Sequence, residues 1–137
     1  MAPRRYYAKK KRPPKETYEQ RNILLRELGF RTYSVYLNSR IWYAIRNSAY
    51  RIHGRTCRLC PRRAITIHHL SYTRAVLLGQ DLSLLAPLCR YCHDQVEFSA
   101  DGRKRTLASS QRHYHKLLST RISQLKRISQ LNSTHTS

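Results

Sequence analysis

Four cysteines constrain the fold of this chain more than any other feature of its sequence. They form two C-x2-C pairs, Cys57 with Cys60 and Cys89 with Cys92, separated by 28 residues. Two such turns each present two thiolates to one tetrahedral ion, and four sulfur ligands are typical of structural zinc. The alternative of two disulfides is disfavoured in a chain expected inside the cell. A four-cysteine site has no open coordination position, so we expect zinc to stabilise the fold and not to catalyse.

The net charge of the chain indicates a polyanionic partner. Twenty-seven Lys and Arg residues stand against seven Asp and Glu residues, which gives +20 at pH 7. Residues 1–15 and the residues after Asp101 carry bases and no acid. Such charge attracts phosphate backbones, and neither end has an apolar stripe that would insert in lipid. We therefore expect nucleic acid and not a membrane as the partner, and the charge does not distinguish double-stranded DNA from RNA.

The hydropathy pattern excludes two classes of protein and suggests a location. The sequence contains no run of 18 apolar residues, which a membrane-spanning helix would need. The basic N-terminus also lacks the apolar run that follows it in a secretory signal. We expect an intracellular, cytoplasmic protein, and a nucleoid-associated or phage-encoded one fits equally well. The apolar share of 40% and mean hydropathy of −0.68 predict a small core that needs the zinc.

Composition and periodicity divide the chain into four segments. We expect a disordered basic arm at 1–15, a helical region at 16–54, a metal-stabilised core at 55–101, and a basic helix with a tail at 102–137. In the helical region, one helix should begin at Thr17 and end at Gly29. A second should run from Ser39 to Ile52, with one shared apolar face made by Trp42, Ile45, Ala49 and Ile52. For Trp42 and Tyr43, core packing is favoured over stacking on bases.

The remaining elements follow from alternation and spacing. The pattern predicts a short strand at 64–68, a long connection at 70–88, a helix at 93–98 and an amphipathic helix at 107–131.

Three histidines lie close to the cysteine turns. His68 and His69 end the predicted strand, and His93 directly follows Cys92. Adjacent strand residues point to opposite faces, so His68 and His69 should have different roles. His93 and Glu97 are four residues apart, on one face of a helix. A second ion held by His68, His93 and Glu97 would keep open positions for phosphate oxygen and water, as metal-assisted phosphodiester hydrolysis requires.

Other polar residues have a weaker context. Asp81 and Asp94 are alternative oxygen donors near that second ion. The other histidines lack a neighbouring motif, and we expect them on the surface: His53, His113, His115 and His135.

These motifs, in this order, resemble the branch of the HNH endonuclease family that contains a four-cysteine zinc site. The resemblance covers about residues 55–98, and it is carried by Cys57-x2-Cys60, Ile67-His68-His69-Leu70-Ser71-Tyr72 and Leu88-Cys89-Arg90-Tyr91-Cys92-His93. It implies an α+β chain with a ββα-metal core, two strands and a helix around a catalytic ion. The zinc on the four cysteines would stabilise this core, and helices would flank it on both sides.

The resemblance also implies roles for individual residues. His69 would be the general base that activates water, and His68 and His93 would be ligands of the catalytic divalent ion. The chain departs from the family pattern at Leu84, where the family has an asparagine, and at Glu97, where some relatives have a histidine. A carboxylate ligand favours Mg²⁺ or Mn²⁺ over Zn²⁺ at that site.

The sequence therefore predicts a metal-dependent DNA endonuclease with little sequence preference. It would act as a monomer or weak homodimer. One alternative is a non-catalytic, zinc-stabilised nucleic-acid-binding protein, and another is a protein-binding adaptor that uses the C-terminal helix. Backbone contacts are expected from basic side chains around the core, namely Arg55, Arg58, Arg62, Arg63, Arg74, Arg90, Lys104 and Arg105.

Overall fold

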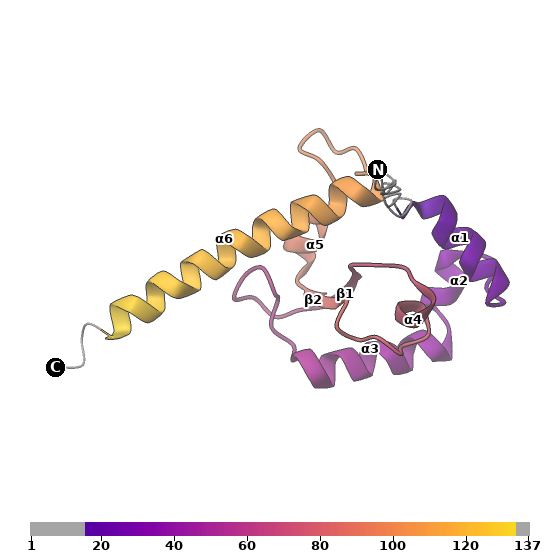
Figure 1. Cartoon of the computed structure of the whole chain (residues 1–137), viewed down its shortest axis with the longest axis horizontal. Coiled ribbons are helices and arrows are strands. Elements are labelled where there is room, and N and C mark those ends of the chain that lie inside the picture. The colour runs from indigo at the N-terminus through magenta and orange to yellow at the C-terminus, as the bar shows by residue number, and fades with distance from the viewer. Residues whose placement is uncertain (1–15, 134–137) are drawn as a thin grey trace, which may run out of the picture.

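The computed structural model describes residues 16–133 and has eight elements in that range (Figure 1). The expected basic arm at 1–15 and the end of the tail, with His135, lie outside the described residues. The helices are α1 (Tyr18–Glu27), α2 (Tyr33–Leu37), α3 (Arg40–His53), α4 (Arg74–Leu77), α5 (Arg90–Glu97) and α6 (Leu107–Ser133). The strands are β1 (Thr66–His69) and β2 (Leu85–Leu88). Helices and a small sheet together confirm the α+β class.

The N-terminal helices begin and end at the residues that the sequence indicates. Thr17 and Gln20 form a capping box at the start of α1, and Ser39 caps α3. Gly29, which follows α1, has a φ of 95°, a conformation that favours glycine. The short helix α2 between them lies in a stretch for which the sequence analysis predicts no element.

The apolar face of α3 is predicted only in part. Trp42, Ile45 and Ala49 are buried, as expected. Ile52 is 65% exposed and Tyr43 is 49% exposed, so the prediction that these two side chains pack in the core is wrong. Tyr50, two residues before Ile52, is the last residue of α3 that is buried in the core.

The sheet differs from the prediction in the bounds of its first strand and in having a second strand. The first strand is Thr66–His69, two residues later than the predicted start. It pairs antiparallel with β2, so that His68 lies opposite Ala86 and His69 opposite Leu85. The long connection predicted at 70–88 therefore contains a helix, α4, and the strand β2. Pro87 makes β2 hard to recognise in the sequence, because a proline argues against a strand in the middle of a sheet. It is tolerated here because β2 is an edge strand.

The helix predicted at 93–98 begins three residues earlier. The Cys89 side chain caps α5 and accepts a hydrogen bond from the Cys92 backbone N–H at 3.4 Å. The cysteine turn is thus also the start of the helix, which places Cys92 and His93 in its first turn.

Both faces of the sheet are covered, which a two-stranded sheet needs for stability. Ile67 and Leu85 join a core with α1, α2, α3 and α4. Ala86 and Leu88 join a second core with the cysteines, Val96 of α5 and Tyr114 of α6. The sheet therefore lies between α3 on one side and α5 with the first half of α6 on the other (Figure 1).

The helix α6 confirms the predicted C-terminal helix. Its first turns are buried, whereas its second half extends away from the body of the protein with exposed apolar side chains, Ile122, Leu125, Ile128 and Leu131 (Figure 1). None of the helices in residues 16–133 combines the length and the apolar content that a bilayer crossing requires.

Candidate active site and metal centres

The two cysteine turns bring four sulfur atoms to one point, as their spacing predicts. All four Sγ atoms lie within 4.8 Å of one another, and those of Cys60 and Cys89 are 3.5 Å apart. A tetrahedral ion with Zn–S bonds of about 2.3 Å needs sulfur–sulfur distances of about 3.8 Å. The four cysteines are thus placed to hold one metal ion, and the distances suit zinc.

The surroundings of the four sulfurs also fit a closed metal centre. Three of the cysteines are buried in the second core, against Leu88 and Tyr114. Backbone N–H groups point at the sulfurs, and the Leu59 N–H donates to Cys57 Sγ at 3.5 Å. Burial raises the pKa of the Cys60 thiol, and a bound cation would favour the ionised form of that thiol. All four positions are sulfur, which suits a structural centre.

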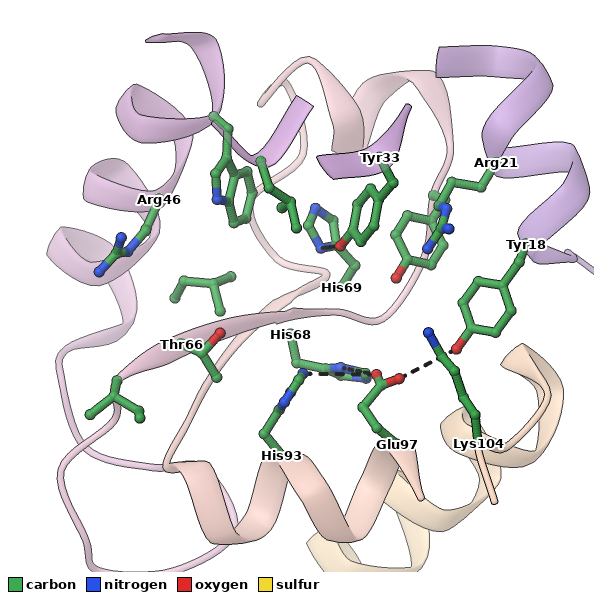
Figure 2. A pocket seen from close by; sticks show the side chains of 15 residues that line it. Tyr18, Arg21, Tyr33, Arg46, Thr66, His68, His69, His93, Glu97 and Lys104 are labelled. Atoms are coloured by element: carbon green, nitrogen blue, oxygen red, sulfur yellow. Dashed lines mark hydrogen bonds and ion pairs between the residues drawn. The ribbon is translucent and has the colours of Figure 1, made fainter. Parts of the chain in front are cut away.

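A second group of possible ligands lies between β1 and α5. His68, His93 and Glu97 each offer a ligand atom within 4.8 Å of the others. Glu97 Oε1 is 3.3 Å from His68 Nδ1 and 3.8 Å from His93 Nε2. Figure 2 shows the three side chains converging below β1. Burial acts to raise the pKa of Glu97, but His68 and His93 outweigh it and hold that pKa below its ordinary value. Glu97 is therefore ionised at neutral pH.

Gln111 of α6 determines which nitrogen of His68 faces this group. Its amide Nε2 donates to the His69 backbone oxygen at 3.0 Å, so its Oε1 must point the other way, toward His68 Nε2 at 3.4 Å. Since an amide oxygen only accepts, His68 Nε2 carries the proton. In neutral His68 the Nδ1 lone pair then faces the Glu97 carboxylate. Two acceptors in contact need a cation or a proton between them, and a metal ion fits this donor set.

His69 lies on the opposite face of β1, as the alternation of strand residues predicts. It is 2% exposed, and its ring stacks on Trp42 at 4.7 Å and on Tyr72 at 5.0 Å between centroids. Its Nδ1 is 3.1 Å from the Tyr33 hydroxyl, while its Nε2 is buried with no hydrogen-bond partner in the described part of the chain. Burial lowers the pKa of His69 to about 3, so the ring is neutral at physiological pH.

One cavity of about 270 Å³ is lined by residues from both faces of β1. Its lining includes His68, His69, His93 and Glu97 (Figure 2). Three permanent cations, Arg21, Arg46 and Lys104, line it against the single carboxylate. The cavity thus places a neutral, buried imidazole and a possible metal-binding group in one positively charged space.

The basic residues predicted to contact nucleic acid are spread over the surface. Only Lys104 lines the cavity. Arg62 lies over the ring of exposed Tyr91 at 5.1 Å and Arg55 over Tyr50 at 4.5 Å. Arg105 is only partly exposed, with a buried Nε. The others are exposed outside the cavity, namely Arg58, Arg63, Arg74 and Arg90.

Other sequence-based expectations are corrected or refined. His53 is half-buried, with its Nε2 2.7 Å from the Leu82 backbone oxygen, so it is not a free surface residue. Leu84 packs against the first core, and its backbone oxygen accepts a hydrogen bond from the Leu70 N–H at 2.8 Å. The loop is thus held here by the backbone. Asp81 is bonded to Ser83 and does not line the cavity, and neither does Asp94.

The sequence analysis overlooks three residues around the candidate site. Arg21 and Tyr33 come from the N-terminal helices, and Gln111 comes from α6. Arg21 alone has a signal in the sequence, because it shares the apolar face of α1 with Tyr18 and Leu25 at helical spacing. Tyr33 is 36 residues from His69 in the sequence, and Gln111 is 43 residues from His68 and 42 from His69. No local pattern reveals contacts over such separations.

Comparison with known proteins gives no match to this chain, whether with family descriptions, with curated proteins or with solved structures.

Proposed function

We propose that this protein is a metal-dependent DNA endonuclease of the HNH type, which hydrolyses phosphodiester bonds. The observation that carries the proposal is the single cavity that contains both a buried imidazole, His69, and the group of His68, His93 and Glu97. The chain order β1, β2, α5 agrees with the two strands and helix of a ββα-metal core. The four-cysteine centre would stabilise that core as a zinc site.

The second group of ligands would hold the catalytic ion. His68 Nδ1, His93 and a Glu97 oxygen supply two nitrogens and one oxygen, and the carboxylate favours Mg²⁺ or Mn²⁺. A divalent ion bound there would offset negative charge on the phosphate oxygens and on the leaving oxygen. Gln111 would hold His68 in the tautomer that directs Nδ1 toward the ion.

His69 would accept the proton of the attacking water at Nε2. This requires that Nδ1–H donate to the Tyr33 hydroxyl oxygen, which leaves the Nε2 lone pair without a partner among the described residues and free to accept. Burial keeps the ring neutral and so ready to accept, but a pKa of about 3 makes it a weak base. An anionic phosphate in the cavity would raise that pKa toward the working range, because an opposite charge favours the imidazolium.

The substrate assignment rests on charge. The cavity is cationic, and the chain carries +20 at pH 7, most of it near its two ends. Contacts from such residues grip a phosphate backbone without reading bases, so we expect weak sequence preference. A single candidate site of this kind among the described residues of each chain predicts nicking, unless two chains act together as a weak homodimer.

The test is a plasmid-nicking assay on His69→Ala, with His115→Ala as the control, since His115 is exposed on α6. His69→Ala should lose nicking, typically by 10²-fold or more for a lost general base, while DNA affinity is unchanged. His115→Ala should nick like the wild type. Nicking that persists in His69→Ala would refute the assignment. Absence of nicking by the wild type with Mg²⁺, Mn²⁺ and Ni²⁺ would favour the alternative, a zinc-stabilised nucleic-acid-binding protein.

A further inference from the structure

Arg21 of α1 is an arginine in an unusual environment. Its side chain is 9% exposed, and its guanidinium lies over three tyrosine rings, 3.9 Å from the centroid of Tyr33, 4.7 Å from that of Tyr18 and 5.2 Å from that of Tyr72. Figure 2 shows it reaching from α1 toward Tyr33, with His69 on the far side of that ring. The rings fix the guanidinium in place, so its position is set before any ligand arrives.

The charge of Arg21 has no carboxylate partner. Within residues 16–133, no Asp or Glu oxygen lies at ion-pair distance from it. Its Nε–H donates to the Asn22 side-chain oxygen at 3.1 Å, and the Tyr72 hydroxyl lies beside it. A guanidinium has five N–H donors, so these neutral partners leave donors unused. Burial of a charge is costly unless an opposite charge compensates it, which a bound anion would do.

A second cation in the same cavity points to the same ligand. Lys104 also lines the cavity, with its ammonium 4.7 Å from the Tyr18 ring centroid. His69 lines this cavity as well, and its buried Nε2 has no partner among the described residues, so its lone pair is left for the water that would attack a bound phosphate and not for the phosphate itself. Glu97 faces the same space, but His68 and His93 surround its carboxylate.

We infer that Arg21 and Lys104 form an anion subsite for one phosphate group of a nucleic-acid backbone, beside His69. This inference rests on the proposed function and assigns the substrate's charged group to named side chains. A guanidinium matches two oxygens of a phosphate with parallel N–H donors, which a lysine ammonium does not do. The tyrosine rings hold Arg21 in the lining of the cavity that His69 also lines.

Trp42 provides a direct readout, because it is the only tryptophan of the chain and lines the cavity. The zinc-loaded full chain is titrated with inorganic phosphate at constant ionic strength and without added divalent cation. We expect a saturable change in Trp42 fluorescence. Arg21→Gln should bind phosphate about 10- to 100-fold more weakly. Arg26→Gln, which removes an exposed arginine five residues along the same helix, should bind like the wild type.

A second probe separates free phosphate from a backbone. The dinucleoside monophosphate of thymidine carries one diester and no terminal phosphate. Binding of this diester with the same dependence on Arg21 supports the backbone assignment. Binding of inorganic phosphate alone overturns that assignment and leaves a site for free or terminal phosphate.

Loss of folding is the foreseeable complication, since Arg21 packs on three rings. If circular dichroism shows that Arg21→Gln is unfolded, phosphate binding is compared between Lys104→Gln and its control Arg103→Gln. Both residues are exposed, and only Lys104 lines the cavity. Weaker phosphate binding in Lys104→Gln alone supports the subsite, and equal binding by the two variants overturns it. Equal binding by folded Arg21→Gln and wild type overturns it as well.

These results are separable from those of the nicking assay. If His69→Ala still nicks while phosphate binding depends on Arg21, the proposed catalytic assignment fails and the anion subsite stands. If His69→Ala loses nicking while Arg21→Gln binds phosphate normally, the nuclease stands and the subsite fails.

Discussion

Gly79 and Gly29 offer a controlled test of how α4 is packed against α3. Each follows a helix at the same position: the glycine N–H donates to the carbonyl three residues back, and the next N–H donates to a carbonyl five residues back. Both glycines have positive φ, 73° for Gly79 and 95° for Gly29. They differ in space, because a Cβ on Gly79 would lie 2.6 Å from Ile45 Cγ1, whereas one on Gly29 would meet nothing within 4 Å.

The magnitudes follow from this difference. A side chain in the left-handed region costs about 1–2 kcal/mol, and alanine recovers about 0.4–1 kcal/mol by restricting the unfolded chain. Gly29→Ala should therefore destabilise the fold by about 1 kcal/mol. Ile45 is 6% exposed and cannot swing away, so Gly79→Ala adds an overpacking cost of about 1–3 kcal/mol. Its total is about 2–4 kcal/mol, still below the roughly 7–20 kcal/mol expected for a chain of this length.

Urea unfolding followed by circular dichroism measures both variants by linear extrapolation. Ile45→Ala removes the clashing carbon, so in that background Gly79→Ala should cost no more than Gly29→Ala. Equal destabilisation of the two single variants, or no rescue by Ile45→Ala, would refute the packing of α4 on α3 described above.

Three further predictions concern the metal sites and pH. Removal of the metal by a chelator should unfold the chain, because structural zinc contributes about 10–16 kcal/mol, comparable with the whole stability; a native circular-dichroism spectrum of protein shown to be metal-free would contradict this. Burial lowers the pKa of His69 to about 3 in the folded chain, whereas it is about 6.5 in the unfolded chain. The contribution of neutral His69 to the free energy of unfolding is therefore complete above pH 6.5. It falls by up to about 1.4 kcal/mol per pH unit as the pH is lowered toward 3. Urea titrations at fixed free zinc should then show a shallower acid slope for His69→Gln, and equal slopes would disprove it. Gln111→Leu should lower Mn²⁺ affinity about 10- to 100-fold in calorimetry relative to the exposed control Gln124→Leu; unchanged affinity would exclude a role for Gln111 in holding His68.

The sequence predicts best what depends on short spacing. The cysteine pairs, the capping residues Thr17 and Ser39 and the opposite orientation of His68 and His69 are local properties of a turn, a helix and a strand. His93 and Glu97 are likewise neighbours on α5 because one helical turn separates them. For this reason the two groups of possible metal ligands can be recognised before the fold is known.

The structure adds what depends on packing across the chain. Pro87 and the four-residue length of β2 hide a strand whose stability comes from two covered faces. Periodicity identifies the apolar face of α3, but not that Tyr50 and not Ile52 enters the core near the end of the helix. The burial of His69 between Trp42 and Tyr72 requires the docking of α3 on the sheet, so its low pKa has no local signal.

The cavity draws its lining and its support from both ends of the described chain. Arg21 comes from the first helix, and Gln111 from the last helix holds His68 and the His69 carbonyl. During synthesis, a growing chain therefore lacks part of this arrangement until α6 has emerged from the ribosome. With the proposed activity, a polypeptide stalled or cleaved before that point would lack the Gln111 contacts and the cover that α6 gives to the second core, so it should cleave nucleic acid less well than the full chain.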